Sequence, residues 1–517
     1  MDMKLQDLKT TLNDEKQLTE NGAVGFKTTG KELLDLNFAA SSLRHLDENK
    51  IYDRFVKAFY EDKLLAIKWL YFLRDVRGGM GERRSFRAIL KNLAHVQPNL
   101  VKQLIPITAE YGREDDLWCL LDTDVRDDVI KYIRIKLVSD TKNASEGKPI
   151  SLLGKWLPSS YSKKEEKRKW AQIIYSGLGM TKKEYDEVLK TLRNKLDVIE
   201  CKISRNEWEE INYPAVPSKA NLLYRNAFLR HDEERRRAYL ASLVKGETKI
   251  NAGALFPHDV VHSYSMGYWR NLKKYDESLE QLWKSLNKYA IEGEGVIVVA
   301  DGSGSMTSGV DSNSNVTALE VANALAIYFS EGLSGEFKDK YITFSARPQL
   351  VDMSKCNSLK EKLEVAYRYN EVANTNIEAV FDLILETAVR NGYTQKEMPS
   401  NVLILSDMEF DSCATDNSHA SDWSYSHGMR STLFDEIAKK YAAHGYKMPR
   451  LTFWNLCSRT GTIPVKQNDM GVSLVSGFSP AIVKMVMSNK TDPYEVLVEQ
   501  LNVPRYDLVE EAFNKVK

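Results

Sequence analysis

The sequence predicts a mixed fold, in which an all-α domain of stacked helices is followed by an α/β domain. From Lys31 to about Lys288, apolar residues recur at spacings of three and four, and no strand-like alternation interrupts them. From about Ile291, short β-branched runs alternate with amphipathic helices, which is typical of a mostly parallel sheet covered by helices on both faces. A chain of 517 residues is also too long for one hydrophobic core, so two to four domains are expected.

Within the helical part, Ile51–Tyr60 and Leu64–Leu73 show the helical spacing clearly, and prolines fall between such segments, where helices stop. Helix after short helix indicates a stacked array of the HEAT-like type, although no fixed repeat period is found. The predicted domains are a poorly ordered polar N-terminal arm (1–30), a helical-repeat domain (31–290), an α/β domain (291–490), and a C-terminal helix and charged tail (491–517).

Five apolar runs in the second half have the length and β-branched content of strands. These runs are Val296–Ala300, Tyr341–Ser345, Asn401–Ser406, Leu451–Leu456 and Gly471–Val475. Helices are predicted at about 316–331, 357–369, 376–390, 429–444, 479–488 and 493–501. The Ser-, Asp- and His-rich stretch Asp411–His427 is expected to be a mobile loop beside the ligand-binding edge of the sheet.

Composition describes an ordinary soluble protein, with 43% apolar and 28% charged residues and no run of membrane-spanning length. The first residues are too polar for a signal peptide. Five scattered cysteines form no CxxC pair, which favours reduced thiols and a cytoplasmic location. The net charge is zero, but 1–300 hold 51 Lys and Arg against 44 Asp and Glu, whereas 301–517 hold 21 against 28. This modest imbalance is compatible with nucleic-acid binding by the front part.

A group of oxygen-bearing side chains follows the first predicted strand directly, in Asp301-Gly-Ser303-Gly-Ser305. The small residues allow a tight turn, and they leave one carboxylate and two hydroxyls at the carboxyl end of the strand. Open α/β sheets bind their ligands at this edge. Oxygen ligands without Cys or His suit a hard cation such as Mg²⁺. The alternative is a serine-rich turn that holds no metal.

Two further segments reach the same edge: Thr375 lies beside the start of a predicted helix, and Asp407 ends a buried strand. With the first segment they resemble the metal-ion-dependent adhesion site (MIDAS) of von Willebrand factor A domains, which have a Rossmann-like fold. The resemblance implies one divalent cation, usually Mg²⁺, with Mn²⁺ or Ca²⁺ as alternatives. It implies direct ligation by Ser303 and Ser305, contributions from Asp301, Thr375 and Asp407 directly or through water, and an open position for an oxygen of a partner. One departure is Met408, since many relatives have Gly after this Asp.

An arginine- and glycine-rich stretch, Arg74-Asp-Val-Arg-Gly-Gly-Met-Gly-Glu-Arg-Arg-Ser-Phe-Arg87, lies between two predicted helices. It has no Gly-Lys-Ser/Thr and no preceding strand, so it is not a phosphate-binding P-loop. The simplest interpretation is a sharp turn braced by ion pairs between arginines and acidic residues. The functional alternative places Arg77, Arg83 and Arg84 on a phosphate backbone.

Four motifs in order resemble a widespread family of uncharacterised proteins from viruses, bacteria and plants. They are Arg74–Arg83, Tyr111–Leu117, Val216–Ala220 and Lys249–His258. That family in turn resembles the TROVE-domain proteins, meaning the Ro autoantigen and its bacterial relatives. The resemblance implies a ring of helical repeats closed by a von Willebrand factor A domain. It also implies binding of structured RNA on the basic outer surface of the ring and of single-stranded RNA ends in its hole.

Basic clusters and nearby aromatic residues are the independent signs of RNA binding. The basic candidates are Lys163, Lys164, Lys167, Arg168, Lys169, Arg225, Arg230 and the run Arg235–Arg237. The aromatic candidates are Trp156, Tyr161, Trp170, Tyr213 and Tyr224. Such side chains can neutralise phosphates and stack on bases. The simpler alternatives are a solvated helix face, aromatic residues of the core, and local pairing of the arginines with Asp232–Glu234.

The leading hypothesis is therefore a non-catalytic, Ro-like RNA-binding scaffold that also carries a cation site, because no nucleophile–base arrangement or ATP motif is present. The alternative is a metal-dependent protein-interaction or structural module, for example in a virion. A metal-dependent hydrolase is disfavoured, since no paired carboxylate or base is evident. A second, softer metal site made of Cys413, His419 and His427 is disfavoured by their irregular spacing.

Overall fold

The computed structural model describes residues 16–19, 24–250, 252–253, 255–266, 271–288, 295–311, 314–344, 348–370, 377–409, 433–463, 472–486 and 492–516. The chain divides into two compact units. A sheet unit comprises 1–46, 56–62 and 255–501, and a helical unit comprises 47–55, 63–254 and 502–517. Among the described residues, no helix combines the length and the hydropathy that crossing a membrane requires.

The helical unit is built from short helices that follow one another closely, and its described residues contain no strand. The helical pattern predicted for this region is therefore confirmed. Its main helices are α4 (Lys63–Arg74), α5 (Arg84–Val96), α6 (Pro98–Leu104), α7 (Thr108–Tyr111), α8 (Arg126–Ser145), α9 (Leu153–Trp156), α10 (Glu165–Leu178), α11 (Lys182–Lys195), α12 (Ile199–Arg205), α13 (Ser218–His231), α14 (Glu233–Val244) and α24 (Asp507–Asn514), and α3 (Glu48–Glu61) contributes residues to both units. Local signals set several ends: Pro98 opens α6, and Gly179 closes α10 with a φ of 74°.

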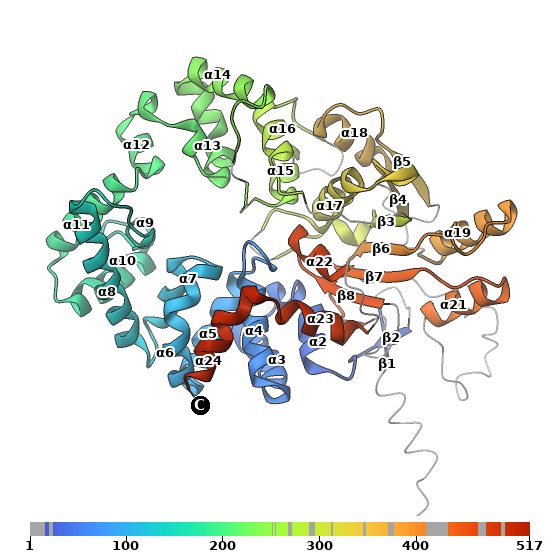
Figure 1. Cartoon of the computed structure of the whole chain (residues 1–517), viewed down its shortest axis with the longest axis horizontal. Coiled ribbons are helices and arrows are strands. Elements are labelled where there is room, and N and C mark those ends of the chain that lie inside the picture. The colour runs from blue at the N-terminus through green and yellow to red at the C-terminus, as the bar shows by residue number, and fades with distance from the viewer. Residues whose placement is uncertain are drawn as a thin grey trace, which may run out of the picture. The chain divides into compact units, whose positions relative to one another are not determined.

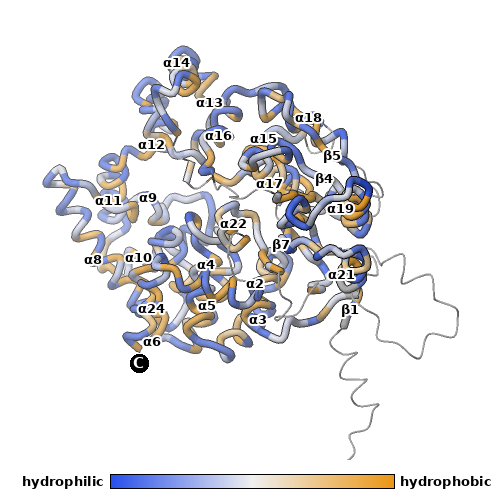
Figure 2. Tube along the Cα trace, turned by 45° about the vertical axis from the view of Figure 1, so that its right-hand side comes forward, coloured by the Kyte–Doolittle hydropathy of each residue, from blue (hydrophilic) through white to orange (hydrophobic). Residues whose placement is uncertain are grey.

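Helix α24 packs against α4 and α6, although more than 400 residues separate them in the sequence. Hydrophobic stretches run through these helices and through α5 (Figure 2). The Tyr506 ring is fully buried and stacks on Tyr111 with ring centroids 5.8 Å apart. The expected single C-terminal helix and tail is thus two helices: α23 (Pro493–Leu501) belongs to the sheet unit and α24 to the helical unit. The apolar face of α24 explains this, because a solvated tail would leave that face exposed.

The sheet unit contains a six-stranded sheet in the order β5-β4-β3-β6-β7-β8 (Figure 1). The strands are β3 (Val296–Asp301), β4 (Lys340–Phe344), β5 (Gln349–Asp352), β6 (Asn401–Ser406), β7 (Arg450–Asn455) and β8 (Val472–Ser476). All neighbouring pairs are parallel except β4 and β5, which are antiparallel. The five predicted strands are confirmed. The edge strand β5 was not predicted, because only Val351 of its four residues is buried and the segment carries no apolar run.

The helices of this unit are α2 (Glu32–Phe38), α15 (Pro257–Tyr264), α16 (Glu277–Lys284), α17 (Ala318–Gly332), α18 (Leu359–Tyr369), α19 (Ile377–Asn391), α21 (Leu433–Ala443), α22 (Val483–Val486) and α23. Helix α17 packs on β3, β4 and β6, and α15 also packs against it (Figure 1). Every residue of α17 from Ala318 to Ser330 is therefore buried, including the polar residues Glu320 and Asn323.

The described part of the N-terminal segment, 16–19 and 24–30, differs from the expectation of a poorly ordered arm. Its described residues form an antiparallel pair of strands, β1 (Lys16–Leu18) and β2 (Val24–Phe26). Phe26 also exchanges two backbone hydrogen bonds with Ile463, with lengths of 2.7 and 2.9 Å. The partner for this polar segment comes from a distant part of the chain, so composition alone could not indicate it.

Candidate metal centre

The site lies where β3 and β6 end side by side. These strands are parallel neighbours, with Ala300 opposite Leu405. The residues that follow each strand therefore reach the same edge of the sheet. After β3 the chain makes the short turn Gly304–Thr307, which carries Ser305. The parallel register thus brings two motifs together that lie about a hundred residues apart in the sequence.

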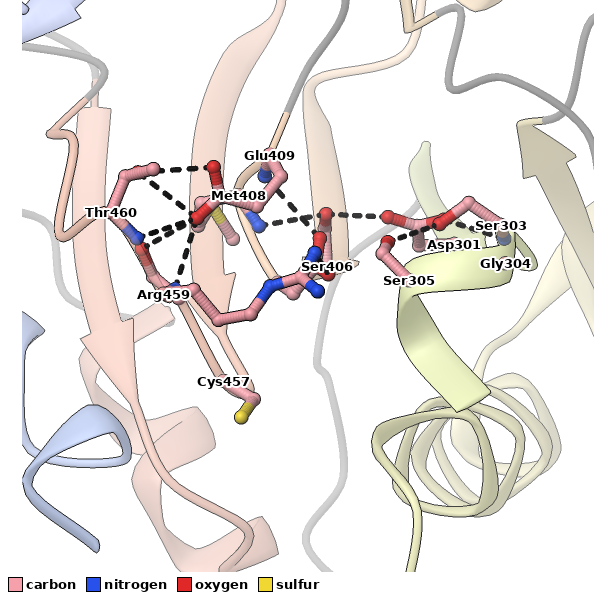
Figure 3. Close-up of polar contacts among 12 residues, drawn as sticks. Asp301, Ser303, Gly304, Ser305, Ser406, Met408, Glu409, Cys457, Arg459 and Thr460 are labelled. Atoms are coloured by element: carbon pink, nitrogen blue, oxygen red, sulfur yellow. Dashed lines mark hydrogen bonds and ion pairs between the residues drawn. The ribbon is translucent and has the colours of Figure 1, made fainter. Parts of the chain in front are cut away.

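Asp301 is the centre of the hydrogen bonding at this edge (Figure 3). Its side chain is almost fully buried, at 1% exposure. Its Oδ1 accepts the N–H of Ser303 at 2.9 Å, and its Oδ2 accepts the Oγ–H of Ser406 at 2.7 Å. The hydroxyl oxygens of Ser303 and Ser305 lie 2.9 Å apart. One carboxylate and two hydroxyls therefore converge, as the sequence predicted.

Asp407 adds a second buried carboxylate, at 2% exposure. Its Oδ1 accepts the N–H of Glu409 at 3.3 Å, and the Nη2 of Arg459 lies 3.5 Å from its Oδ2. Met408 has a φ of 64°, in the left-handed region that favours glycine. This backbone conformation explains why glycine suits the position. Burial of the Met408 side chain, which is 1% exposed, offsets the strain.

The negative charge of Asp407 raises the cost of ionising Asp301. Burial, and then the charge of Asp407, raise the pKa of Asp301 to about 7. Burial raises the pKa of Asp407 as well, against a hydrogen bond from Ser305 that lowers it. Two acidic groups with serine hydroxyls beside them form a donor set of oxygens only, which fits a hard divalent cation. Among the described residues no group of three or more His, Cys, Asp or Glu is arranged to hold a metal ion, so a cation here would depend on the hydroxyls.

Three residues at the site escaped the sequence analysis: Ser406, Glu409 and Arg459. Glu409 is fully buried, and its Oε1 accepts the backbone N–H groups of Arg459 and Thr460, each at 3.0 Å. These bonds hold the loop after β7 in place, and the Arg459 side chain extends from that loop toward the site (Figure 3). The acidic pair two residues apart after a buried strand was the available signal. No signal in the sequence indicated that Glu409 would bind the backbone of the loop after β7.

Several predicted residues lie outside this arrangement or outside the described residues. Thr375 is not among the described residues, nor are Cys413, His419 and His427 or the stretch Asp411–His427. The other four cysteines, Cys119, Cys201, Cys356 and Cys457, form no disulfide with one another among the described residues.

The basic residues predicted for RNA binding lie at separate places in the helical unit. Arg83 and Arg84 are exposed at the start of α5, and Lys163, Lys164, Lys167 and Arg168 are exposed around the start of α10. Three of the candidates make contacts within the unit: Arg77 donates to the carbonyl of Glu110, Lys169 pairs with Asp122, and Arg225 donates to the carbonyl of Leu222. Arg230 is exposed on α13. Arg235 and Arg237 pair with Asp232 and Glu233, which confirms local pairing for these two. Among the aromatic candidates, Tyr213 is buried in the core and Tyr161 is exposed.

Comparison with known proteins gives matches over both units. A family described as a domain of unknown function (DUF7788) matches residues 295–511, and a second (DUF2828) matches 161–292. The crystal structure of the Ro (RSR) protein of Deinococcus radiodurans is similar over 89% of this chain and 92% of that chain, at 12% identity and a TM-score of 0.36. A similarity at that level does not establish a common fold.

A closer relative in sequence comes from a virus. The uncharacterized protein L728 of Acanthamoeba polyphaga mimivirus is 30% identical over 526 aligned residues, which cover 93% of this chain and 86% of the viral protein. An identity of that size over nearly the whole length includes both units. The chain therefore belongs to the same protein family as mimivirus L728.

Proposed function

We propose that this protein binds one divalent cation at the carboxyl edge of its sheet and uses it to hold an anionic oxygen of a partner, without catalysing a reaction. The observation that carries the proposal is the placement of two buried carboxylates, Asp301 and Asp407, beside two serine hydroxyls. Burying like charges together is unfavourable, and a cation with oxygen ligands removes that penalty. Mg²⁺ is the first candidate, with Mn²⁺ and Ca²⁺ as alternatives.

The hydroxyl oxygens of Ser303 and Ser305 would hold the ion directly, and Asp301 and Asp407 would hold it directly or through water. Thr375 joins this set through the resemblance to von Willebrand factor A domains. When bound, the cation supplies a positive charge with a coordination position for an oxygen of the partner. Arg459, close to Asp407 and partly exposed, adds a second positive charge beside that position. A carboxylate of a protein partner fits this pair of positive charges.

The groups next to the site support binding rather than catalysis. Glu409 already accepts hydrogen bonds from the backbone of the loop after β7 and from the hydroxyl of Thr460 at both of its oxygens, so it is poorly placed to act as a base. Burial raises the pKa of the Cys457 thiol to about 11, so this thiol stays protonated near neutral pH and is a weak nucleophile.

Calorimetric titration of the full-length chain with Mg²⁺ tests the site. We expect Ser303→Ala and Ser305→Ala to weaken binding by about tenfold or more, since even residues behind metal ligands contribute that much. Ser354→Ala is the matched control, because Ser354 is an exposed serine of the same unit. Failure of the parent protein to bind any of the three cations at millimolar concentration would exclude the proposal. So would equal affinities of all three variants.

A partner held through the cation should be released by EDTA and lost with Asp301→Ala. Retention of the partner under both conditions would show that it binds elsewhere, and the proposal for this site would then fail.

RNA binding by the helical unit is the second candidate, and the charge distribution favours it. Residues 63–254 hold 37 Lys and Arg against 26 Asp and Glu. Lys163, Lys164 and Lys167 project into solvent around the start of α10. The test is the 260/280 nm absorbance ratio and the extractable nucleic acid of the purified protein, followed by RNA binding at increasing salt. Lys163→Glu/Lys167→Glu should weaken RNA binding and reduce its salt dependence, whereas the control Lys148→Glu should not. Nucleic-acid-free protein that binds no RNA at low salt would exclude this function.

A further inference from the structure

Four arginines of the helical unit gather between α4, α5 and the segment after α7. Asp116 is buried and accepts from the Nε of Arg74 at 2.7 Å and from the Nε of Arg87 at 2.8 Å. Asp115 accepts two hydrogen bonds from Arg113, at 2.8 and 2.7 Å, and the Nη2 of Arg87 lies 3.1 Å from it. These three arginines and two aspartates therefore carry a net charge of one positive unit.

Arg83 raises that excess to two. It occupies the N-cap position of α5, one turn before Arg87, so the two side chains share a face of the helix. Within the described part of the chain, no carboxylate is recorded within ion-pairing distance of Arg83. Partial burial of its guanidinium, and then the positive charge of Arg113, lower the pKa of Arg83 to about 10. The charge of Asp115 raises the pKa of Arg83, whereas the charges of Arg74 and Arg87 lower it further.

Two buried polar atoms of the cluster lack a hydrogen-bond partner among the described residues: the Nη2 of Arg74 and the Nη2 of Arg87, whose only recorded contact is the ion pair with Asp115. Arg74 is 1% exposed. Leaving such a group unmatched costs about 1–3 kcal/mol. Gly112 allows the crowding, since a Cβ there would lie 2.7 Å from the Nε of Arg74 and 2.3 Å from the Oδ2 of Asp116.

The start of α5 adds the positive end of a helix of 13 residues. No side chain caps this end, and its first turn carries no acidic residue. By contrast, α11 begins with a capping box in which Thr181 and Glu184 bond each other's backbone N–H groups. The first N–H groups of a helix need acceptors from outside it. An anion at the start of α5 would supply one.

We propose that this arginine cluster, Arg74, Arg83, Arg87 and Arg113, binds a phosphate monoester. The excess of two positive charges matches the charge of about −1.5 to −2 that a monoester carries at neutral pH, and its three free oxygens can accept from several donors at once. A backbone phosphodiester has one charge and leaves half of that excess uncompensated. The monoester is either the 5′ end of an RNA strand or a small phosphorylated molecule. This site is independent of the cation site.

Binding to the full-length chain at constant ionic strength tests the proposal, with inorganic phosphate, a nucleoside 5′-monophosphate and a short RNA with and without a 5′-phosphate as probes. We expect Arg83→Gln to weaken binding of the phosphorylated probes by about tenfold or more, as a charge-assisted contact implies. Arg237→Gln is the matched control, because Arg237 is an exposed arginine of the same unit that pairs with Glu233. It should leave binding unchanged.

Thermal unfolding of Arg83→Gln separates ligand binding from folding. Without ligand this variant should unfold at the same temperature as the parent or higher, because it removes an excess positive charge, yet phosphate should stabilise it less than it stabilises the parent. Preference for the 5′-phosphorylated over the unphosphorylated RNA would identify an RNA end as the source. Binding of the small probes alone would identify a small phosphorylated molecule. Equal affinities of the parent, Arg83→Gln and Arg237→Gln, or no binding of any phosphorylated probe, would overturn the proposal.

Discussion

Replacing Asp301 with Asn tests the electrostatics of the metal centre at nearly constant side-chain size. Burial and the charge of Asp407 raise the pKa of Asp301 from 3.8 to about 7. A rise of about three units destabilises the folded state by about 4 kcal/mol once the carboxyl is ionised. The amide loses a charge-assisted hydrogen bond from Ser406, which is worth about 2 kcal/mol. We therefore expect the cation-free variant to be about 2 kcal/mol more stable than the parent protein at pH 8.

The sign of the pH dependence follows from the direction of the shift. A carboxyl whose folded pKa is raised destabilises the folded state only above its unfolded pKa of 3.8, and the penalty is complete above about pH 7. The advantage of Asn should therefore vanish near pH 4. When Mg²⁺ is present at 100 times its dissociation constant, binding should raise the free energy of unfolding of the parent by about 2.7 kcal/mol and leave that of the variant unchanged. The parent should then be the more stable of the two.

Denaturant unfolding of the sheet unit, followed by tryptophan fluorescence with EDTA and with Mg²⁺, measures both effects. Glu386→Gln is the control, since this exposed carboxyl of the same unit should change stability by less than about 0.5 kcal/mol. A cation-free Asp301→Asn protein that is less stable than the parent at pH 8, or an order that stays the same in Mg²⁺, would refute the reasoning.

Three further predictions concern stability. At Met408 we expect Gly to be about 1 kcal/mol more stable than Ala by denaturant unfolding, the reverse of the usual order, because φ is 64°; equal stabilities would argue against strain. The pKa of His262 is raised by its hydrogen bond to Glu320. The stability that His262 contributes, measured as the difference in unfolding free energy from His262→Gln, should therefore be complete below pH 6.5 and decrease as the pH rises above that value. A difference that increases with pH would contradict this. Arg505→Ala leaves the buried Asp75 without its bidentate partner and should cost the helical unit about 3 kcal/mol in thermal or denaturant unfolding; a loss below about 1 kcal/mol would show that water replaces the arginine.

Much of the sheet unit could be predicted because its signals are local. Buried parallel strands are continuous apolar runs, so β3 and β6 were found within one residue of their ends. Once these strands are neighbours in one sheet, Asp301, Ser303, Ser305 and Asp407 must meet at its carboxyl edge, and they do. The short edge strand β5 carried no such run, since most of its residues face solvent.

The sequence by itself therefore determined the order of helices and strands, and it identified Asp301, Ser303, Ser305 and Asp407 as candidate site residues. It could do so because helical periodicity and the ends of strands depend on residues that are close together in the chain. Only the tertiary structure decided that Arg459 reaches Asp407, that Phe26 pairs with Ile463, and that Arg505 neutralises Asp75 across 430 residues. It also decided which arginines of the Arg74–Arg87 stretch are matched by carboxylates and which are left in excess. The physical reason is that charge compensation depends on distance in space, and a sequence records only which charges exist.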